Sequence, residues 1–352
     1  MSLDALRALV EQSYQPDEYP VAYEQAHIWR LTRPLAGLTI LDATPVFRNT
    51  LTKYIALIEA GAHVLIGISE VMPRDEKIVD YLRKHGFDVV TPQTLSHPVD
   101  IVLDCAAAFI RCAPRIGYVE LTRSGVDKYD SVSKPVFIAD SGRIKRIETC
   151  LGTGESYYRA MAQIGYKDWA NKNLVVFGSG KVGTGLITYA HKMGAHVYVV
   201  TRPDDASDLV KSISVKVIDC HDAKQIEEVL VLADAVVSAT GVANAMTGNF
   251  DPRVLIDSHA LIANMGVEDE FGPDIPAERV LENKRTFNFI LEEPTLLKYI
   301  DATMALHNEG AVWLVENPHA KGLIEPPSHL EARLLETCRR DGTIADELDW
   351  IL

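Results

Sequence analysis

The sequence predicts an α/β fold: two doubly wound parallel-sheet domains, the second a Rossmann dinucleotide-binding domain, with C-terminal helices that return to the first. Three observations favour this fold. Short apolar segments alternate with helical segments along most of the chain, which is typical of parallel sheets covered on both faces. A glycine-rich turn stands between one apolar segment and the helix after it. Beyond Pro294 the alternation stops and the pattern becomes helical.

The composition limits the class of protein. The chain has 352 residues, 47% of them apolar and 24% charged, which is enough for two domains with their own cores. The net charge of −14, without basic runs, argues against nucleic acid or an anionic membrane as partner. The five cysteines are scattered, which favours reduced thiols in a cytoplasmic protein over a disulfide frame or a metal site. We expect no signal peptide and no membrane span, because no long apolar stretch is present.

The first domain is expected to contain six strands and two helices. We expect strands over residues 38–41, 64–68, 88–90, 101–103, 118–121 and 136–139, and helices over 50–60 and 74–85. A helix over 155–164 leads into the second domain, and helices over 296–315 and 330–339 cross back. The prediction is therefore a flavodoxin-like α/β substrate domain formed by residues 1–148 and 296–352. Residues 149–295 form an NAD(P)-binding Rossmann domain, and the substrate binds between the two.

The second domain opens with the most informative stretch. An apolar strand, Leu174–Phe177, is followed by Gly178, Gly180 and Gly183 in G-x-G-x-x-G spacing, a helix over 184–193 and a strand over 196–200. The first glycine permits a tight turn, the second lets the backbone approach a pyrophosphate, and the third lets helix and strand pack closely. Further strands are expected over 215–218, 235–239, 261–265 and 286–290. The turn also contains Ser179, Lys181 and Val182, and all six residues are predicted to bind the cofactor. The alternative is a glycine turn with a purely structural role.

The end of the second strand bears on which cofactor binds. A free ribose 2′-hydroxyl is usually held by a carboxylate at this place, whereas an arginine suits a 2′-phosphate. Here the strand ends in Thr201 and Arg202, and the carboxylates of Asp204 and Asp205 come just beyond. A hydroxyl and a guanidinium both donate to phosphate, so we favour NADP over NAD. The alternative is that Arg202 is solvated and Asp204 reaches back to the ribose of NAD.

Six further motifs lie in a fixed order along the chain, and they are Pro34–Gly37, Gly61–Val64, Glu120–Val126, Leu151–Ser156, Ser238–Gly241 and Asn264–Gly266. In order and spacing they resemble the S-adenosylhomocysteine hydrolase family, over about residues 33–314. The resemblance implies a homologous fold and a tightly bound dinucleotide. It also implies cofactor contacts at the family's matching positions, which are Thr122, Ser124, Thr153, Thr240, Gly241 and Asn264.

The catalytic positions of that family are altered here. Its members oxidise a ribose hydroxyl and abstract the neighbouring proton, which requires bases around the sugar. Where the family has a histidine this chain has Pro45, where it has a lysine this chain has Ile144, and where it has a second histidine this chain has Val267. Apolar side chains cannot transfer protons. The chain therefore resembles a divergent member that lacks the family's catalytic His and Lys residues.

Four other residues are candidates for chemistry, each with a simpler alternative. Lys145 could bind a substrate carboxylate or be a surface charge on a linker, and Glu148 keeps a carboxylate where the family has one. Glu293 could orient the nicotinamide region or belong to a loop. His307 could be the general acid/base of hydride transfer, or a packed residue of an apolar helix. The run Glu268–Glu270 is expected to be solvated.

These observations leave three functions open. The leading one is an NAD(P)-dependent oxidoreductase, on an adenosylhomocysteine hydrolase-like scaffold, that acts on a small polar metabolite. The second is an adenosylhomocysteinase, which hydrolyses S-adenosylhomocysteine to adenosine and homocysteine with relocated catalytic groups. The third is a catalytically silent NAD(P)-binding sensor or partner protein. We expect a cytoplasmic homo-oligomer (dimer or tetramer) with a small-molecule substrate and no metal, nucleic acid or membrane partner.

Overall fold

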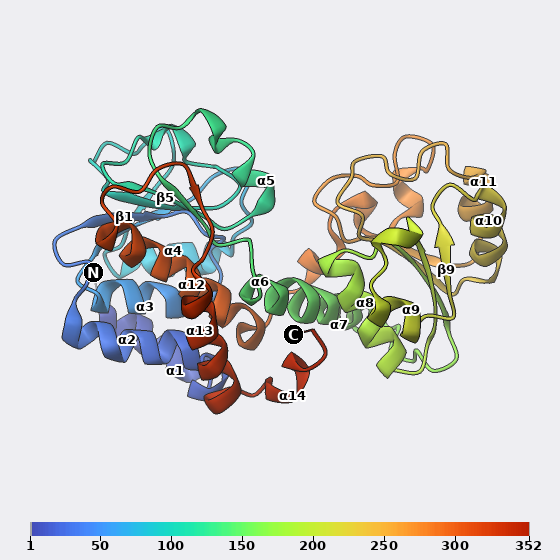
Figure 1. Ribbon diagram of the computed structural model, residues 1–352, viewed down its shortest axis with the longest axis horizontal. Helices are drawn as coiled ribbons and strands as arrows, with labels where there is room; N and C mark the ends of the chain where they lie inside the picture. Colours follow the sequence, from blue (N-terminus) through green and yellow to red (C-terminus); the bar gives the residue numbers. More distant parts are fainter. Residues whose placement is uncertain (1, 352) are drawn as a thin grey trace. The chain divides into compact units, whose positions relative to one another are not determined.

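The computed structural model describes residues 2–351, which form two compact units (Figure 1). Unit 1 combines the chain up to Ile147 with the chain from Leu296, and unit 2 is the continuous segment Glu148–Thr295. Each unit is a parallel sheet with helices on its faces, as the alternating pattern predicted. The C-terminal helices belong to unit 1, as predicted.

The sheet of unit 1 has seven parallel strands. They are β1 (Thr39–Asp42), β2 (His63–Gly67), β3 (Asp88–Val90), β4 (Ile101–Asp104), β5 (Gly117–Glu120), β6 (Val136–Ile138) and β12 (Leu323–Ile324). Their order is β12-β6-β5-β4-β1-β2-β3. The order from β3 to β6 reads 3-2-1-4-5-6, whereas a flavodoxin-like sheet has the order 2-1-3-4-5. The direction of winding therefore changes between β1 and β4, where a doubly wound sheet places a ligand crevice.

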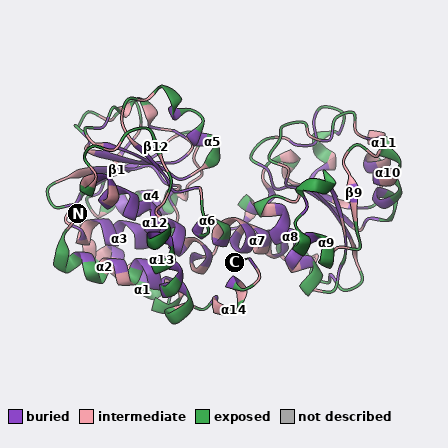
Figure 2. Ribbon diagram, in the orientation of Figure 1, coloured by how far each residue is buried: buried purple, intermediate pink, exposed green. Residues whose placement is uncertain are grey.

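Nine helices accompany this sheet within the described residues. They are α1 (Leu3–Ser13), α2 (Pro20–Thr32), α3 (Leu51–Glu59), α4 (Glu76–Lys84), α5 (Arg123–Val126), α6 (Ile144–Arg146), α12 (Leu297–Glu316), α13 (Ser328–Asp341) and α14 (Ala345–Leu348). Helix α12 is buried along most of its length, because α2 and α3 pack against it and it also contacts β4, β5 and β6 (Figure 2). A helix from the end of the chain thus completes the core of the N-terminal sheet.

Unit 2 has a five-stranded parallel sheet in the order β11-β10-β7-β8-β9. The strands are β7 (Asn173–Phe177), β8 (His196–Thr201), β9 (Lys216–Asp219), β10 (Ala235–Ser238) and β11 (Leu261–Asn264). The helices are α7 (Thr153–Gln163), α8 (Lys181–Lys192), α9 (Asp208–Ile213), α10 (Ala223–Leu232) and α11 (Pro252–Ile256). The order corresponds to 3-2-1-4-5, and the winding changes between β7 and β10.

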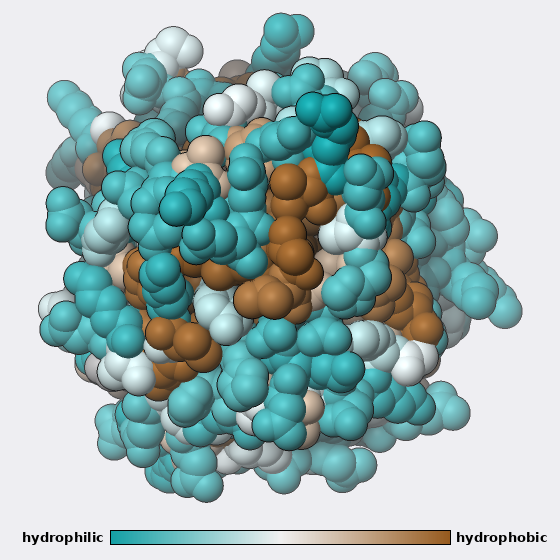
Figure 3. Space-filling view, turned by 90° about the vertical axis from the view of Figure 1, so that its right-hand side faces the viewer, coloured by the Kyte–Doolittle hydropathy of each residue, from teal (hydrophilic) through white to brown (hydrophobic). Residues whose placement is uncertain are grey.

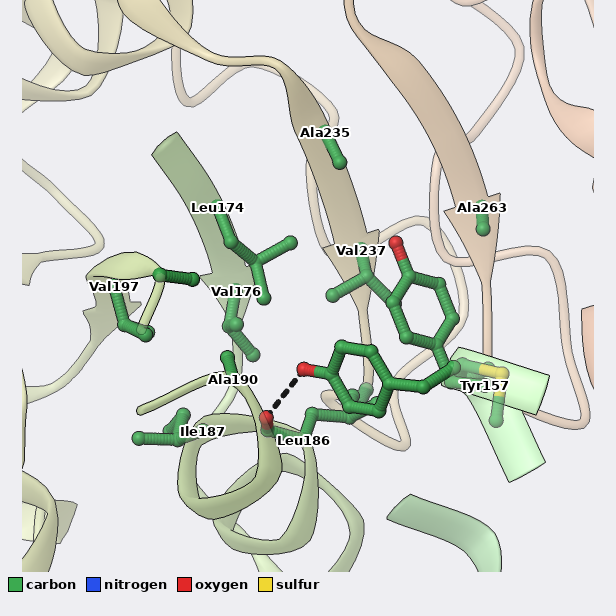
Figure 4. Close-up of a cluster of buried hydrophobic side chains, with 14 of the residues drawn as sticks. Tyr157, Leu174, Val176, Leu186, Ile187, Ala190, Val197, Ala235, Val237 and Ala263 are labelled. Carbon is green, nitrogen blue, oxygen red and sulfur yellow. Dashed lines mark hydrogen bonds between the residues drawn. The ribbon is translucent and has the colours of Figure 1, made fainter. Parts of the chain in front are cut away.

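Both faces of the unit 2 sheet are buried, which explains the continuous apolar runs of its strands. Alternate residues of β7 point to opposite sides, so Leu174 and Val176 join one cluster while Val175 and Phe177 join the other. Figure 4 shows the first cluster, where the Tyr158 hydroxyl donates a hydrogen bond of 2.5 Å to the Leu186 carbonyl. This bond ties α7 to α8 and so fixes the helix that follows the glycine turn.

The structure corrects two expectations about the elements of unit 2. Residues 286–290 are not a strand: Phe287–Ile290 form a 3₁₀ turn, and a single bridge between Asn264 and Thr286 continues the sheet. Helix α8 begins at Lys181, three residues earlier than expected, because Gly180 already occupies the N-cap position. No helix within residues 2–351 is long and apolar enough to cross a membrane.

Unit 2 is mostly hydrophilic on the face that Figure 3 shows, with apolar patches between the polar side chains. Its exposed large apolar residues are Ile164, Leu209, Val215, Val231, Leu232, Val242, Val267 and Phe289. Val242 and Val267 stand out, because they follow β10 and β11 at the carboxyl edge of the sheet, where ligands of such folds bind.

Candidate functional site

The glycine turn of unit 2 has the backbone geometry that its sequence predicts. Gly178 follows β7 with φ +96°, a conformation that favours glycine, and its N–H donates to the Val200 carbonyl at 2.9 Å. A Cβ on Gly178 would lie 2.5 Å from the Ala239 carbonyl oxygen, and one on Gly183 would lie 2.2 Å from the Gly178 carbonyl oxygen. Both glycines are therefore required by close backbone approach within the protein itself.

Gly180 differs from the other two glycines. A Cβ at this position would meet no atom within 4 Å, so the protein's own packing does not require glycine here. The residue is the N-cap of α8, and no side chain caps the helix. Gly180 and Lys181, at the positive end of the helix dipole, are both exposed. That arrangement suits a phosphate group.

The tip of β8 lies beside this turn. The hydroxyls of Ser179 and Thr201 are 3.1 Å apart, which joins the glycine turn to the end of the second strand. The Arg202 guanidinium is 70% exposed, and its Nε donates to the Asp205 carboxylate at 2.7 Å. Asp204 is also exposed. The tip thus offers a hydroxyl and an accessible cation, with a carboxylate that neutralises part of the charge.

The residues after β10 and β11 are held by an unexpected side chain. Glu270 is fully buried, so the expectation of a solvated charge run is wrong for this residue. Its carboxylate accepts hydrogen bonds from the Thr240 N–H and hydroxyl, both at 2.8 Å, and from the Gly241 N–H at 2.7 Å. The Asn264 amide donates to the carbonyls of Glu268 and Lys284, each at 2.7 Å. The resemblance indicated Thr240 and Asn264, whereas no motif singled out Glu270.

The other candidate cofactor residues divide between the two units. In unit 2, Thr153 begins α7 and its hydroxyl donates to the Glu148 carbonyl at 3.3 Å. In unit 1, the Thr122 hydroxyl donates to the Glu120 carboxylate at 2.7 Å, and Ser124 is exposed. Within unit 2 the structure brings together the glycine turn, the tip of β8, and the loops after β10 and β11.

The four catalytic candidates also divide between the units. Lys145 and His307 belong to unit 1, and Glu148 and Glu293 belong to unit 2. Lys145 is buried, and its ammonium group donates to the Leu121 carbonyl at 2.9 Å. The interpretation of Lys145 as a surface charge on a linker is therefore wrong. The Glu293 side chain is half-buried. The backbone carbonyl of Glu293 accepts a hydrogen bond from the Arg159 guanidinium at 2.8 Å.

His307 lies in the interior of unit 1. The side chain is fully buried in α12, and Nε2 is 2.9 Å from the Val119 carbonyl oxygen, so Nε2 carries the proton. Burial, followed by the charge of Lys53, lowers the pKa of the imidazole well below its ordinary value. The ring is therefore neutral and packed. This agrees with the interpretation of His307 as a packed residue of a helix.

Unit 1 also gathers buried charged residues at the carboxyl ends of its strands, and the sequence reasoning did not single these residues out as a site. Asp42 ends β1 and forms a fully buried ion pair with Lys53 of α3. Asp104 ends β4, where burial, and then the charge of Glu120, raise the pKa of its carboxyl group to about 7. Glu120 ends β5, and its carboxylate accepts from backbone N–H groups of the loop after β4. In that loop Ala106 and Ala107 have φ of +55° and +57°. Strained backbone of this kind is common at ligand sites.

Potential metal ligands gather at one place among the described residues. Asp219, Cys220 and His221 follow one another at the end of β9, with ligand atoms within 4.8 Å. The Asp219 carboxylate accepts a hydrogen bond from the backbone N–H of His221 at 3.0 Å. All five cysteines are free thiols.

The strand order and the glycine turn define unit 2 as a Rossmann-type dinucleotide-binding fold. Comparison with known proteins agrees at this level. Residues 160–256 match the family model for shikimate/quinate 5-dehydrogenase. In fold, the chain is similar to one of the dipicolinate synthase subunits of Bacillus halodurans, with a TM-score of 0.52 and 10% identity, covering 80% of this chain and 98% of that one.

Curated relatives cover a longer part of the sequence. The chain is 26% identical over 264 residues to an adenosylhomocysteinase of Halobacterium salinarum, which covers 66% of this chain and 60% of the relative. It is 28% identical over 287 residues to an adenosylhomocysteinase of Archaeoglobus fulgidus, which covers 73% of this chain and 69% of the relative. The match to the first of these thus spans less than two thirds of the relative's own length.

Proposed function

We propose that this protein binds NAD(P) in unit 2 and is an NAD(P)-dependent oxidoreductase for a small polar metabolite. One observation carries the coenzyme proposal: the open space at Gly180, beside an uncapped helix N-terminus. Gly178 and Gly183 are explained by packing within the protein, but Gly180 is not. A ligand that needs close backbone approach accounts for it, and a pyrophosphate is such a ligand.

The tip of β8 supports NADP over NAD. A 2′-phosphate would lie near the Thr201 hydroxyl and the exposed Arg202 guanidinium, which donates in two directions. In the present structure the Asp205 carboxylate accepts a hydrogen bond from Nε of that guanidinium. Binding of NADP would therefore require Arg202 to turn from this carboxylate toward the phosphate.

For the chemical step we propose that Glu148 and Glu293 of unit 2 contact the substrate. In unit 1, the buried ammonium group of Lys145 donates to the Leu121 carbonyl at 2.9 Å and lies 4.0 Å from the Asp140 carboxylate, so its charge is already balanced within the protein. His307 would then support the core of unit 1 and take no part in proton transfer. We further propose that the protein is a homo-oligomer, a dimer or tetramer, which light scattering of the purified protein would measure.

The test is a titration of the purified protein with NADH and with NADPH, followed by nicotinamide fluorescence. We expect saturable binding, tighter for NADPH. If neither coenzyme binds, the proposal is wrong. Where binding occurs, hydride transfer is measured at 340 nm across a panel of small hydroxy and keto acids. Binding without any turnover would instead favour a silent coenzyme-binding sensor or partner protein.

A second candidate function is adenosylhomocysteinase, the activity for which the relatives described above are named. Incubation with adenosine and homocysteine, followed by chromatography, would reveal S-adenosylhomocysteine. We expect no product, because Pro45, Ile144 and Val267 stand where that family has proton-transferring side chains. Product formation would make this second function the better one.

A further inference from the structure

The buried carboxylate of Glu270 connects the two loops at the carboxyl edge of the unit 2 sheet. Besides the Thr240 and Gly241 groups, it accepts a hydrogen bond from the fully buried Ser238 hydroxyl at the end of β10. These donors are all uncharged groups, so their dipoles alone stabilise the buried charge. The carboxylate thus gathers the end of β10 and the first residues of the loop after it.

The loop after β11 closes around the same carboxylate. A Cβ on Gly266 would lie 2.1 Å from a Glu270 carboxylate oxygen, so a larger residue here would displace the carboxylate. The Met246 N–H also donates to the Glu270 backbone carbonyl at 3.1 Å. One acidic residue therefore determines the path of both loops.

The same arrangement extends to the glycine turn. Gly178 packs directly against Ala239 and Thr240, since its Cβ would lie 2.5 Å from the Ala239 oxygen and 3.0 Å from the Thr240 Cα. Next to these contacts, in each loop, an apolar side chain faces solvent. Val242 is 58% exposed, and Val267 is 85% exposed. A pair of exposed valines at a ligand-binding edge suits the flat apolar face of an aromatic ring better than it suits water.

We propose that Glu270 is a positioning residue for the nicotinamide half of the coenzyme, an inference that rests on the proposed function. Its carboxylate holds the loops after β10 and β11 in the shape that presents Val242 and Val267 to the nicotinamide ring. The adenine half lies at the other side of the glycine turn, at Thr201 and Arg202, and does not depend on this carboxylate.

The experiment compares Glu270→Gln with Glu268→Gln. The two substitutions remove the same charge from the same acidic run, but the Glu268 side chain is exposed. We expect Glu270→Gln to weaken NAD(P)H binding about tenfold or more, because an amide cannot accept from all the donors around it. The altered fluorescence spectrum of the bound nicotinamide should be lost as well. Glu268→Gln should bind like the wild type.

A second ligand separates positioning from simple damage to the fold. ADP-ribose, which lacks the nicotinamide ring, should bind the Glu270→Gln variant within about threefold of the wild type, since one lost contact to the ring half does not reach the adenine half. Equal weakening of ADP-ribose and NAD(P)H would show general disruption and would overturn the proposal. Tighter NAD(P)H binding by the variant would also overturn it, because Glu270 would then be blocking the site.

Two further measurements keep the inference testable if Glu270→Gln is unstable. Ser238→Ala removes one donor to the carboxylate and should weaken NAD(P)H by a smaller factor, with ADP-ribose unchanged. Amide hydrogen exchange of residues 239–242 and 265–268 should be faster in both variants than in the wild type. If the wild type binds no coenzyme, the proposed function fails and this inference fails with it. If the wild type binds and the variants bind equally well, only this inference fails.

Discussion

Substitution of Gly180 by alanine tests the reasoning about the coenzyme site most directly. The residue has φ −68° and ψ −163°, which alanine adopts without strain, and its Cβ would meet no protein atom within 4 Å. Alanine is a weaker N-cap than glycine by up to about 1 kcal/mol. It also stiffens the unfolded chain, which stabilises the fold by about 0.4–1 kcal/mol. The two effects nearly cancel, so the free energy of unfolding should hardly change.

Coenzyme affinity, in contrast, should fall strongly. The added methyl group would occupy the space through which a pyrophosphate reaches the backbone N–H groups of α8. Loss of one hydrogen bond to a charged phosphate is worth about 1.5–3 kcal/mol, or a factor of about 10 to 150 in affinity. We therefore expect the Kd for NAD(P)H to rise by that factor, while Tm stays within about 4 °C of the wild type.

The matched comparison is Gly183→Ala. Its Cβ would lie 2.2 Å from the Gly178 carbonyl oxygen, which is backbone and cannot turn aside. Overpacking of this kind costs about 1–3 kcal/mol or more, so both Tm and binding should fall. Fluorescence titration and thermal melts of the two variants, measured together, give the result. A Gly180→Ala variant that binds coenzyme as the wild type does would refute the reasoning about this site.

Three further outcomes are expected. Arg202→Ala should weaken NADPH about tenfold and leave NADH within about twofold, because the guanidinium would contact only a 2′-phosphate; equal effects on both coenzymes in titrations would contradict this. Lys53→Met should lower the free energy of unfolding by about 3–5 kcal/mol in urea titrations, since it leaves Asp42 charged and buried without its cation; a loss under about 1 kcal/mol would contradict it. Burial raises the pKa of Asp301 from 3.8 to about 7, so the folded protein holds this proton more tightly than the unfolded chain. Stability should therefore fall as the pH rises from about 4 to about 7, and Asp301→Asn should remove up to about 4 kcal/mol of that fall in urea titrations at each pH; an unchanged slope would refute the assignment.

The glycine turn could be predicted from sequence because its geometry is local. The close approach of Gly183 to Gly178 involves residues five positions apart, and the flanking apolar strands set the frame. The same holds for Thr201 and Arg202, which are placed by the end of one strand. The order of strands in unit 1 was not predictable in this way, because the alternation of strands and helices does not say which strands are neighbours.

Glu270 and Lys53 show where sequence reasoning ends. Each is a charged residue that would ordinarily face water. Each is buried because its partners come from other elements: Ser238 and Thr240 lie about 30 residues before Glu270, and Asp42 ends the strand before α3. His307 was ambiguous for the same reason. Its helix is buried along most of its length, and only the packing of α12 against β5 decides where the ring points.

The divided path of the chain through unit 1 sets an order for folding during synthesis. Unit 2 is one continuous segment, so all of its strands are synthesised before α12. Unit 1 begins first but lacks the helix that fills its centre until residues 297–316 emerge. A nascent chain halted before that point would expose to water the residues of β4 and β5 that α12 covers.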